Sequence, residues 1–153
     1  MKPIDILGLK NFRVFDNETG FFEEMSAINV LTGANSSGKS SVIKALQMIK
    51  NSIRGDFSFE LDLTQQEHLL GDFENVLNSK DNRELSISLP FTFMGLTNFF
   101  ITLGFVVQPE DTYKAKLRKI EVTDTFDKRN LFLFYYRDAS ESEIKEDAEE
   151  YQR

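Results

Sequence analysis

Residues 33–40, Gly-Ala-Asn-Ser-Ser-Gly-Lys-Ser, combine the residue types that bind a phosphate group. The two glycines let the backbone curl, so that several N–H groups can point at one anion. Lys39 adds a positive charge directed at the β- and γ-phosphates, and the Ser40 hydroxyl is a ligand for Mg²⁺. The spacing of the glycines, the lysine and the serine therefore predicts a phosphate-binding P-loop.

A P-loop needs a strand before it and a helix after it, and the flanking segments have these patterns. The apolar run Ile28–Leu31 predicts the strand, and the helical period of residues 41–54 predicts the helix. One face of that helix carries, at spacings of four, three and four, Val42, Leu46, Ile49 and Ile53. Gly55 follows as a C-cap. This context favours nucleotide binding.

The rest of the chain has the alternation of β-strands. Two strands are expected within the first 31 residues, and residues 69–77 form a short helix or a loop. Pro90 indicates a sheet edge or a bulge. Further strands are predicted at residues 57–63, 85–93, 98–107, 113–122 and 131–136. The expected fold is α/β with α+β character: a P-loop NTPase lobe with a long helix after the P-loop and an antiparallel β subregion.

Composition sets the class of protein. The 153 residues are 41% hydrophobic and 28% charged, which suits one globular domain. There is no cysteine, no secretory signal and no apolar run long enough to span a bilayer, so a cytoplasmic protein without membrane contact is expected. Residues 138–153 hold seven acids against Lys145 and Arg153. We expect residues 1–137 to form the lobe and 138–153 an acidic tail or the start of a helical arm.

Three segments carry a family resemblance. Residues 6–15 read Ile-Leu-Gly-Leu-Lys-Asn-Phe-Arg-Val-Phe, and residues 28–41 read Ile-Asn-Val-Leu-Thr-Gly-Ala-Asn-Ser-Ser-Gly-Lys-Ser-Ser. Together with Leu-Leu-Gly-Asp-Phe-Glu-Asn-Val-Leu at 69–77, they resemble the N-terminal half of an ABC-type ATPase head of the OLD, RecF and SMC-like group of bacterial AAA-type ATPases. Asn35 at the third P-loop position is typical of that group.

The resemblance implies ATP and Mg²⁺ as cofactors and gives roles to single residues. Arg13 matches an arginine that lies near the nucleotide or reaches toward DNA; a surface strand arginine is the alternative. Gln66, or its neighbour Gln65, matches the glutamine that joins Ser40 at Mg²⁺, unless both are solvated loop residues. His68 is expected in a loop or in packing. The nucleotide would be bound by Gly33, Asn35, Ser36, Ser37, Gly38, Lys39, Ser40 and Ser41.

Other parts of an ATP-hydrolysing site are missing from the sequence. Residues 131–138 end in an aspartate, but Tyr135, Tyr136 and Arg137 separate it from the apolar quartet, so a core strand is expected there rather than a catalytic carboxylate. No Leu-Ser-Gly-Gly-like signature is present. No catalytic residue is therefore assigned, and ATPase activity is expected only as part of a longer chain or a complex.

Three functions stay open. The first is the ATP-binding lobe of an OLD/SMC-like ATPase, whose ATP-driven dimerisation controls DNA repair or anti-phage defence. The resemblance then implies a homodimer or complex through the head, with DNA and a nuclease as possible partners. The second is a non-catalytic half-domain that binds nucleotide or docks a partner. The third is a kinase or GTPase, but residues 78–81 read Asn-Ser-Lys-Asp instead of the guanine-reading Asn-Lys-x-Asp.

Overall fold

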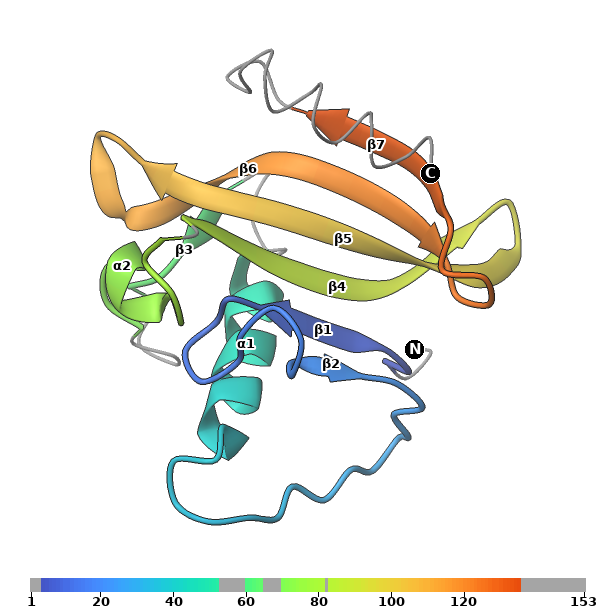
Figure 1. The fold of residues 1–153 in the computed structure, drawn as a ribbon, viewed down its shortest axis with the longest axis horizontal. Coiled ribbons are helices and arrows are strands. Elements are labelled where there is room, and N and C mark those ends of the chain that lie inside the picture. The colour runs from blue at the N-terminus through green and yellow to red at the C-terminus, as the bar shows by residue number, and fades with distance from the viewer. Residues whose placement is uncertain (1–3, 53–59, 65–69, 82, 136–153) are drawn as a thin grey trace.

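The structure is a computed structural model that describes residues 4–52, 60–64, 70–81 and 83–135 (Figure 1). It is a mixed α/β fold, in which seven strands pair antiparallel in one sheet. This confirms the predicted fold class. The elements are β1 (Leu7–Lys10), β2 (Phe21–Phe22), α1 (Lys39–Ser52), β3 (Glu60–Asp62), α2 (Phe73–Val76), β4 (Glu84–Phe93), β5 (Leu96–Gln108), β6 (Asp111–Asp124) and β7 (Asn130–Tyr135).

The sheet is a meander extended at both sides. Strands β4 to β7 follow one another in the chain and pair in that order. Strand β1 pairs with β4, and β2 pairs with β1. The other side of β6 is shared by β3, at residues 114–116, and by β7, at residues 119–123. The alternating apolar runs of the sequence thus become the hairpins of one sheet.

Pro90 sits where a proline does least harm. Strand β1 pairs with β4 only at residues 86–88, so β4 has β5 alone as its neighbour at Pro90. The register of the β4–β5 ladder also shifts between Phe91 and Phe93. A residue without an N–H is tolerated in both settings, which confirms the predicted edge or bulge.

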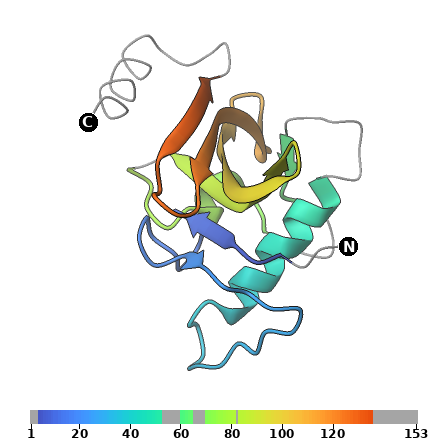
Figure 2. The ribbon, with the colours of Figure 1, turned by 90° about the vertical axis from the view of Figure 1, so that its right-hand side faces the viewer.

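The helices cover one face of the sheet, and the core lies between the helices and this face (Figure 2). In α1 the buried residues are Ser41, Val42, Ala45 and Met48. The predicted apolar face is confirmed, since Leu46 and Ile49 also pack against the core. Ile53, Arg54 and Gly55 lie outside the described residues. Helix α2 is the short helix expected within residues 69–77; the Asp72 side chain accepts a hydrogen bond from the Asn75 N–H and caps it.

One buried polar side chain joins the end of β1 to the segment that enters β4. Asn11, 2% exposed, follows β1 at φ +53°. Its Nδ2 donates to the carbonyls of Ser79 (3.1 Å) and Glu84 (3.0 Å), and its Oδ1 accepts from the Ser79 N–H (2.7 Å). Asparagine is among the residues that tolerate a positive φ. Asn11 therefore holds the end of β1 against the segment that enters β4.

Two sequence expectations are wrong. Ile28–Leu31 form no strand, and Ile28 and Val30 are 85% and 82% exposed. A strand needs a neighbour for its backbone groups, and none of the described strands pairs with this segment. The run at 131–136 forms β7, but as an edge strand in which Leu131, Phe132 and Phe134 are about half exposed, so it is not a core strand.

Candidate functional site

The loop before α1 has the backbone conformation that glycines allow. Gly33, Ser36 and Gly38 have φ values of +141°, +65° and +94°. At Gly38 a side chain is excluded twice, because a Cβ would lie 2.7 Å from Val14 Cγ2 and 2.8 Å from Phe15 Cζ. The glycine spacing thus lets the loop turn back and bring the start of α1 against the turn after β1.

The Lys39 ammonium lies inside this loop. Its Nζ donates to the carbonyl oxygens of Gly33 (2.8 Å) and Ala34 (2.5 Å), and it lies 3.3 Å from Ser37 Oγ. The Ser37 N–H donates to the Ala34 carbonyl across the turn (3.3 Å). The lysine and the loop therefore form one compact unit with its positive charge at the centre.

The first turn of α1 supplies further donors for an anion. The Gly38 carbonyl accepts the first helical hydrogen bond, from the Val42 N–H (3.0 Å), which leaves the N–H groups of residues 39–41 without an acceptor in the helix. The first turn holds no acidic residue. The helix dipole adds to this positive character. Ser40 is exposed and Ser41 is buried, so Ser40 has the hydroxyl that can reach Mg²⁺.

The residues present fit the phosphates of a nucleotide. The loop offers backbone donors, the Lys39 charge and the Ser40 hydroxyl, which are the groups that a phosphate and its Mg²⁺ require. Asn35, Ser36 and Ser37 are exposed on the same loop. All the P-loop residues predicted from the sequence thus lie together, between residue 33 and the first turn of α1 (Figure 1).

Arg13 lies in the turn that contacts the end of the P-loop. Its N–H donates to the Val76 carbonyl and its own carbonyl accepts from Asn78 Nδ2, both at 2.7 Å. Its side chain is exposed, and its neighbours Val14 and Phe15 border Gly38. The arginine is therefore not in a regular strand, as one expectation had it, but in a tied turn beside the loop.

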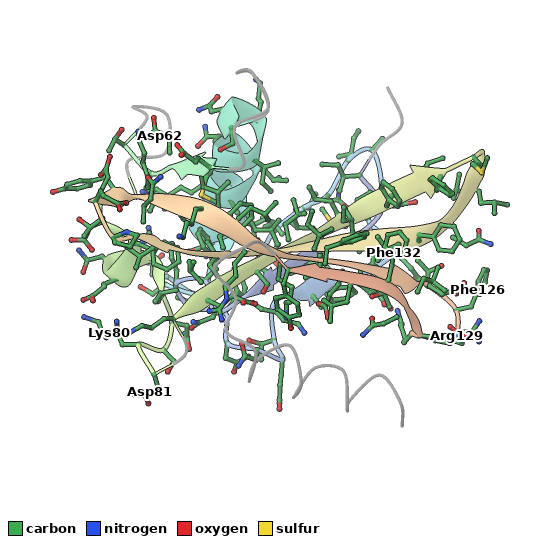
Figure 3. All side chains as sticks on the ribbon, turned by 90° about the horizontal axis from the view of Figure 1, so that it is seen from above. Asp62, Lys80, Asp81, Phe126, Arg129 and Phe132 are labelled. Atoms are coloured by element: carbon green, nitrogen blue, oxygen red, sulfur yellow. The ribbon has the colours of Figure 1, made fainter. Side chains whose placement is uncertain are left out.

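Other candidates are not brought to this site. Gln65, Gln66, His68 and the acidic segment 138–153 lie outside the described residues. Within the described ranges, no group of three His, Cys, Asp or Glu side chains could hold a metal. The Asn-Ser-Lys-Asp segment is structural: Asn78 binds Arg13, and Lys80 pairs with Glu74 at 3.9 Å. Lys80 and Asp81 stand at the opposite end of the molecule from Phe126 and Phe132 (Figure 3).

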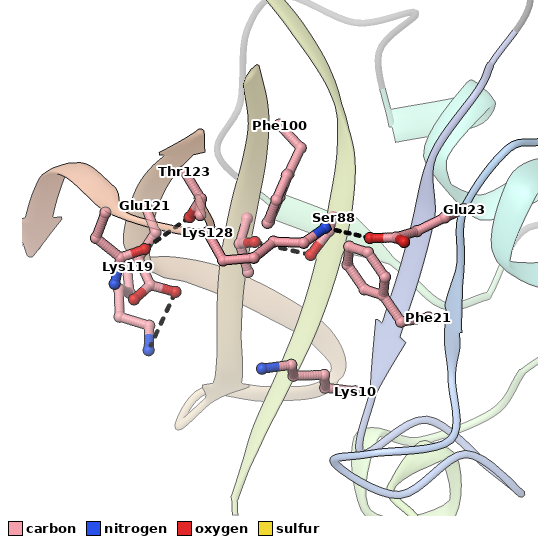
Figure 4. A pocket seen from close by; sticks show the side chains of 11 residues that line it. Lys10, Phe21, Glu23, Ser88, Phe100, Lys119, Glu121, Thr123 and Lys128 are labelled. Atoms are coloured by element: carbon pink, nitrogen blue, oxygen red, sulfur yellow. Dashed lines mark hydrogen bonds and ion pairs between the residues drawn. The ribbon is translucent and has the colours of Figure 1, made fainter. Parts of the chain in front are cut away.

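The sequence reasoning missed a second concavity of about 480 Å³, on the sheet face away from α1 (Figure 4). Its floor is a buried hydrogen bond between Ser88 Oγ and Thr102 Oγ1 (2.7 Å). Lys128 pairs with Glu23 across it, with Nζ 5.7 Å and 5.8 Å from the ring centroids of Phe21 and Phe100. The signal was in the strands, whose polar residues alternate with the apolar ones of the core face.

The charges of this concavity are largely balanced. Lys119 lies 3.5 Å from Glu84 and 3.8 Å from Glu121, Lys128 faces Glu23, and Lys10 is the third lysine beside these three glutamates. A polyanion such as nucleic acid needs an excess of positive charge, which this face does not offer. The concavity is therefore a poor fit for nucleic acid, and it shares no residue with the loop at residues 33–40.

The two helices of the described residues, α1 and α2, are both too short and too polar to cross a bilayer.

Comparison with known proteins agrees with the loop geometry. No curated protein and no solved structure matches the chain. One family does match, over residues 28–152, and its description reads "AAA domain, putative AbiEii toxin, Type IV TA system". Since the match covers most of the 153 residues and includes the P-loop, the chain belongs to this family of AAA domains.

Proposed function

We propose that this chain is the ATP-binding lobe of an OLD/SMC-like ATPase, with Mg²⁺ held by Ser40 and the phosphates held by the loop from Gly33 to Ser41. The observation that carries the proposal is the position of the Lys39 ammonium, 2.8 Å and 2.5 Å from two carbonyls of the loop that a triphosphate would occupy. Arg13, in the adjacent turn, is the candidate for a further contact to the nucleotide.

The chain's own groups would act by binding and orienting. Backbone N–H groups of the loop and of the first turn of α1 would hold the β-phosphate. Lys39 would leave the loop carbonyls and move its charge onto the β- and γ-phosphates, where the acceptor as well as the donor is charged. Bound Mg²⁺ supplies neutralisation of phosphate charge. None of the described residues is assigned as the group that orients the attacking water.

The exposed segment before the loop favours a lobe that is completed by other protein. Ile28 and Val30 are 85% and 82% exposed, and no described strand pairs with this segment. Such a segment becomes a strand when another strand pairs with it. We propose that a complementary polypeptide supplies the strand that pairs with residues 28–31, together with the carboxylate for hydrolysis. ATP turnover then needs this polypeptide. The alternative is a non-catalytic half-domain, which binds nucleotide or docks a partner but never gains turnover.

The family match and the resemblance support a proposal about the biological setting. The description of the family names a toxin of a type IV toxin–antitoxin system. The resemblance to the OLD group implies DNA repair or anti-phage defence with DNA and a nuclease as partners. We propose that ATP-driven dimerisation of this lobe serves a system of this kind.

The test is nucleotide affinity in two lysine variants. Lys39→Ala removes the charge from the loop, and Lys50→Ala removes an exposed charge from the last turn of the same helix. We expect Lys39→Ala to weaken Mg·ATP binding by a factor on the order of 10 to 100, since charged hydrogen bonds contribute about 1.5–3 kcal/mol. Lys50→Ala should bind as the wild type does. Equal affinity of all three proteins in calorimetry, with unchanged circular dichroism, would remove the P-loop proposal.

A further inference from the structure

Strand β7 is an open edge of the sheet that the described residues form. Among the described strands it has β6 as its one neighbour, through pairs from Lys119↔Tyr135 to Thr123↔Asn130. The only other described strand on that side of β6 is β3, which pairs farther along at residues 114–116. Half of the backbone N–H and C=O groups of β7 therefore point away from the sheet. Backbone groups of this kind are a template for another strand.

The side chains of β7 do not protect this edge. The strand reads Asn-Leu-Phe-Leu-Phe-Tyr, without charge, proline or glycine. Natural edge strands are commonly guarded by lysine, proline or a bulge, because an apolar edge invites pairing. Instead, Leu131, Phe132 and Phe134 are 45%, 49% and 56% exposed. An unguarded apolar edge in a native protein is most simply explained by a strand that covers it.

The sequence of β7 matches itself in the antiparallel direction. Around Leu133, the residues on either side are phenylalanines, and the next ones out are Leu131 and Tyr135. If a second β7 pairs antiparallel about Leu133, Phe132 lies opposite Phe134 of the other copy, and the reverse. Directly opposed aromatic side chains are favourable cross-strand pairs. A two-fold axis through Leu133 thus pairs Leu133 with itself and the two phenylalanines with each other, while Leu131 lies opposite Tyr135 of the other copy.

We propose that β7 is a homodimerisation edge, covered by β7 of a second copy of this chain. The two sheets would join into one continuous sheet. Phe132 and Phe134, whose rings already meet edge to face at 5.0 Å, would form a ladder of four phenylalanines across the axis. This interface is distinct from dimerisation through bound ATP, because none of the P-loop residues contributes to it.

The size of the patch sets the strength of the dimer. An aromatic side chain buries about 150–250 Å², so the half-exposed side chains of β7 offer roughly 300 Å² of apolar surface in each copy. Stable interfaces bury about 800 Å² per partner. The β7 dimer is therefore reversible and depends on protein concentration, with backbone pairing as its main source of specificity.

The experiment is sedimentation equilibrium of the full chain over a wide concentration range, without nucleotide. The expected result is a reversible rise from the 17.7 kDa of one chain to twice that mass. The double variants Phe132→Lys/Phe134→Lys and Phe132→Glu/Phe134→Glu should each stay monomeric, since like charges then lie opposite one another. An equimolar mixture of the two variants should recover the doubled mass. Phe126→Lys, at an 80% exposed position beside the strand, is the matched control and should dimerise as the wild type does.

Three outcomes would overturn the proposal. The first is a wild type that stays monomeric at every concentration. The second is a dimer that persists in both double variants while circular dichroism reports an intact fold. The third is a lysine–glutamate mixture that stays monomeric although each variant is folded. Failure of the proposed nucleotide function is read separately, because Lys39→Ala should leave the β7 dimer unchanged.

Discussion

Replacing Asn11 by alanine tests whether this side chain holds the end of β1 against the segment that enters β4. Among the described residues, the change removes two hydrogen bonds to the carbonyls of Ser79 and Glu84 and one from the Ser79 N–H, of 3.1, 3.0 and 2.7 Å. Each is worth about 1 kcal/mol. The φ of +53° adds roughly 1 kcal/mol for an alanine. Water at exposed Ser79 recovers part of this sum, so we expect a loss of about 3 kcal/mol.

The assay is urea unfolding followed by circular dichroism, with the free energy of unfolding taken by linear extrapolation. Asn11→Gly separates the two contributions, because glycine loses the same hydrogen bonds without the penalty at positive φ. It should be about 1 kcal/mol more stable than Asn11→Ala. Asn17→Ala, at an exposed position, is the matched control and should change stability by less than about 0.5 kcal/mol. A loss below about 1 kcal/mol in Asn11→Ala would refute the reasoning.

Backbone geometry and ionisation give two further predictions. Gly38→Ala should destabilise the protein by about 1–3 kcal/mol in the same assay, because φ is +94° and a Cβ would lie 2.7 Å and 2.8 Å from neighbouring side chains. Gly71→Ala is the control: its φ is +83° but nothing lies within 4 Å, so it should cost about 1 kcal/mol. Equal losses of stability in the two variants would contradict the packing argument. Hydrogen bonds from the backbone N–H groups of Glu18 and Thr19, and from the Thr19 hydroxyl, lower the pKa of Asp16. Its folded pKa is thus below its unfolded pKa, so its stabilising contribution is present above the unfolded value of about 3.9 and is lost as the pH falls through the folded pKa. Asp16→Asn should remove this part of the pH dependence below about pH 4 in thermal melts, and an unchanged profile would count against it.

Much of the fold could be predicted because its signals are local. The alternation of residues 85–93 and 113–122 depends on burial of one sheet face, and it found β4 and β6. The helical spacing of Val42, Leu46 and Ile49 found α1 for the same reason. Hydrophobic periodicity reads these contacts directly, since each element presents one face to the core.

What could not be predicted depends on partners elsewhere in the chain. Residues 28–31 have the composition of a strand, but whether they pair depends on a neighbour that local sequence does not specify. Leu131 to Tyr135 is apolar on both faces, which fits a core strand and an open edge equally well. The hydrogen bonds of Asn11 join residues that are nearly half the chain apart, so no local sequence pattern predicts them.

The residues of the candidate site could be predicted from the sequence, but their hydrogen bonds could not. The Gly-x4-Gly-Lys-Ser spacing gave the loop, and the positive φ values of Gly33 and Gly38 agree with it. The internal hydrogen bonds of Lys39 depend on the loop's conformation and could not be read from the spacing. That these residues bind ATP stays a prediction, which the Lys39→Ala experiment addresses.

The meander from β4 to β7 bears on how the protein folds. Each of its pairings joins strands that are consecutive in the chain, as in β4–β5 and β5–β6, whereas Gly8 must find Ser88 to join β1 to the sheet. Loop closure costs more entropy for the distant pairing, so local hairpins form first. The meander from β4 to β7 is then the early folding unit, and the N-terminal segment with the loop at residues 33–40 joins it later.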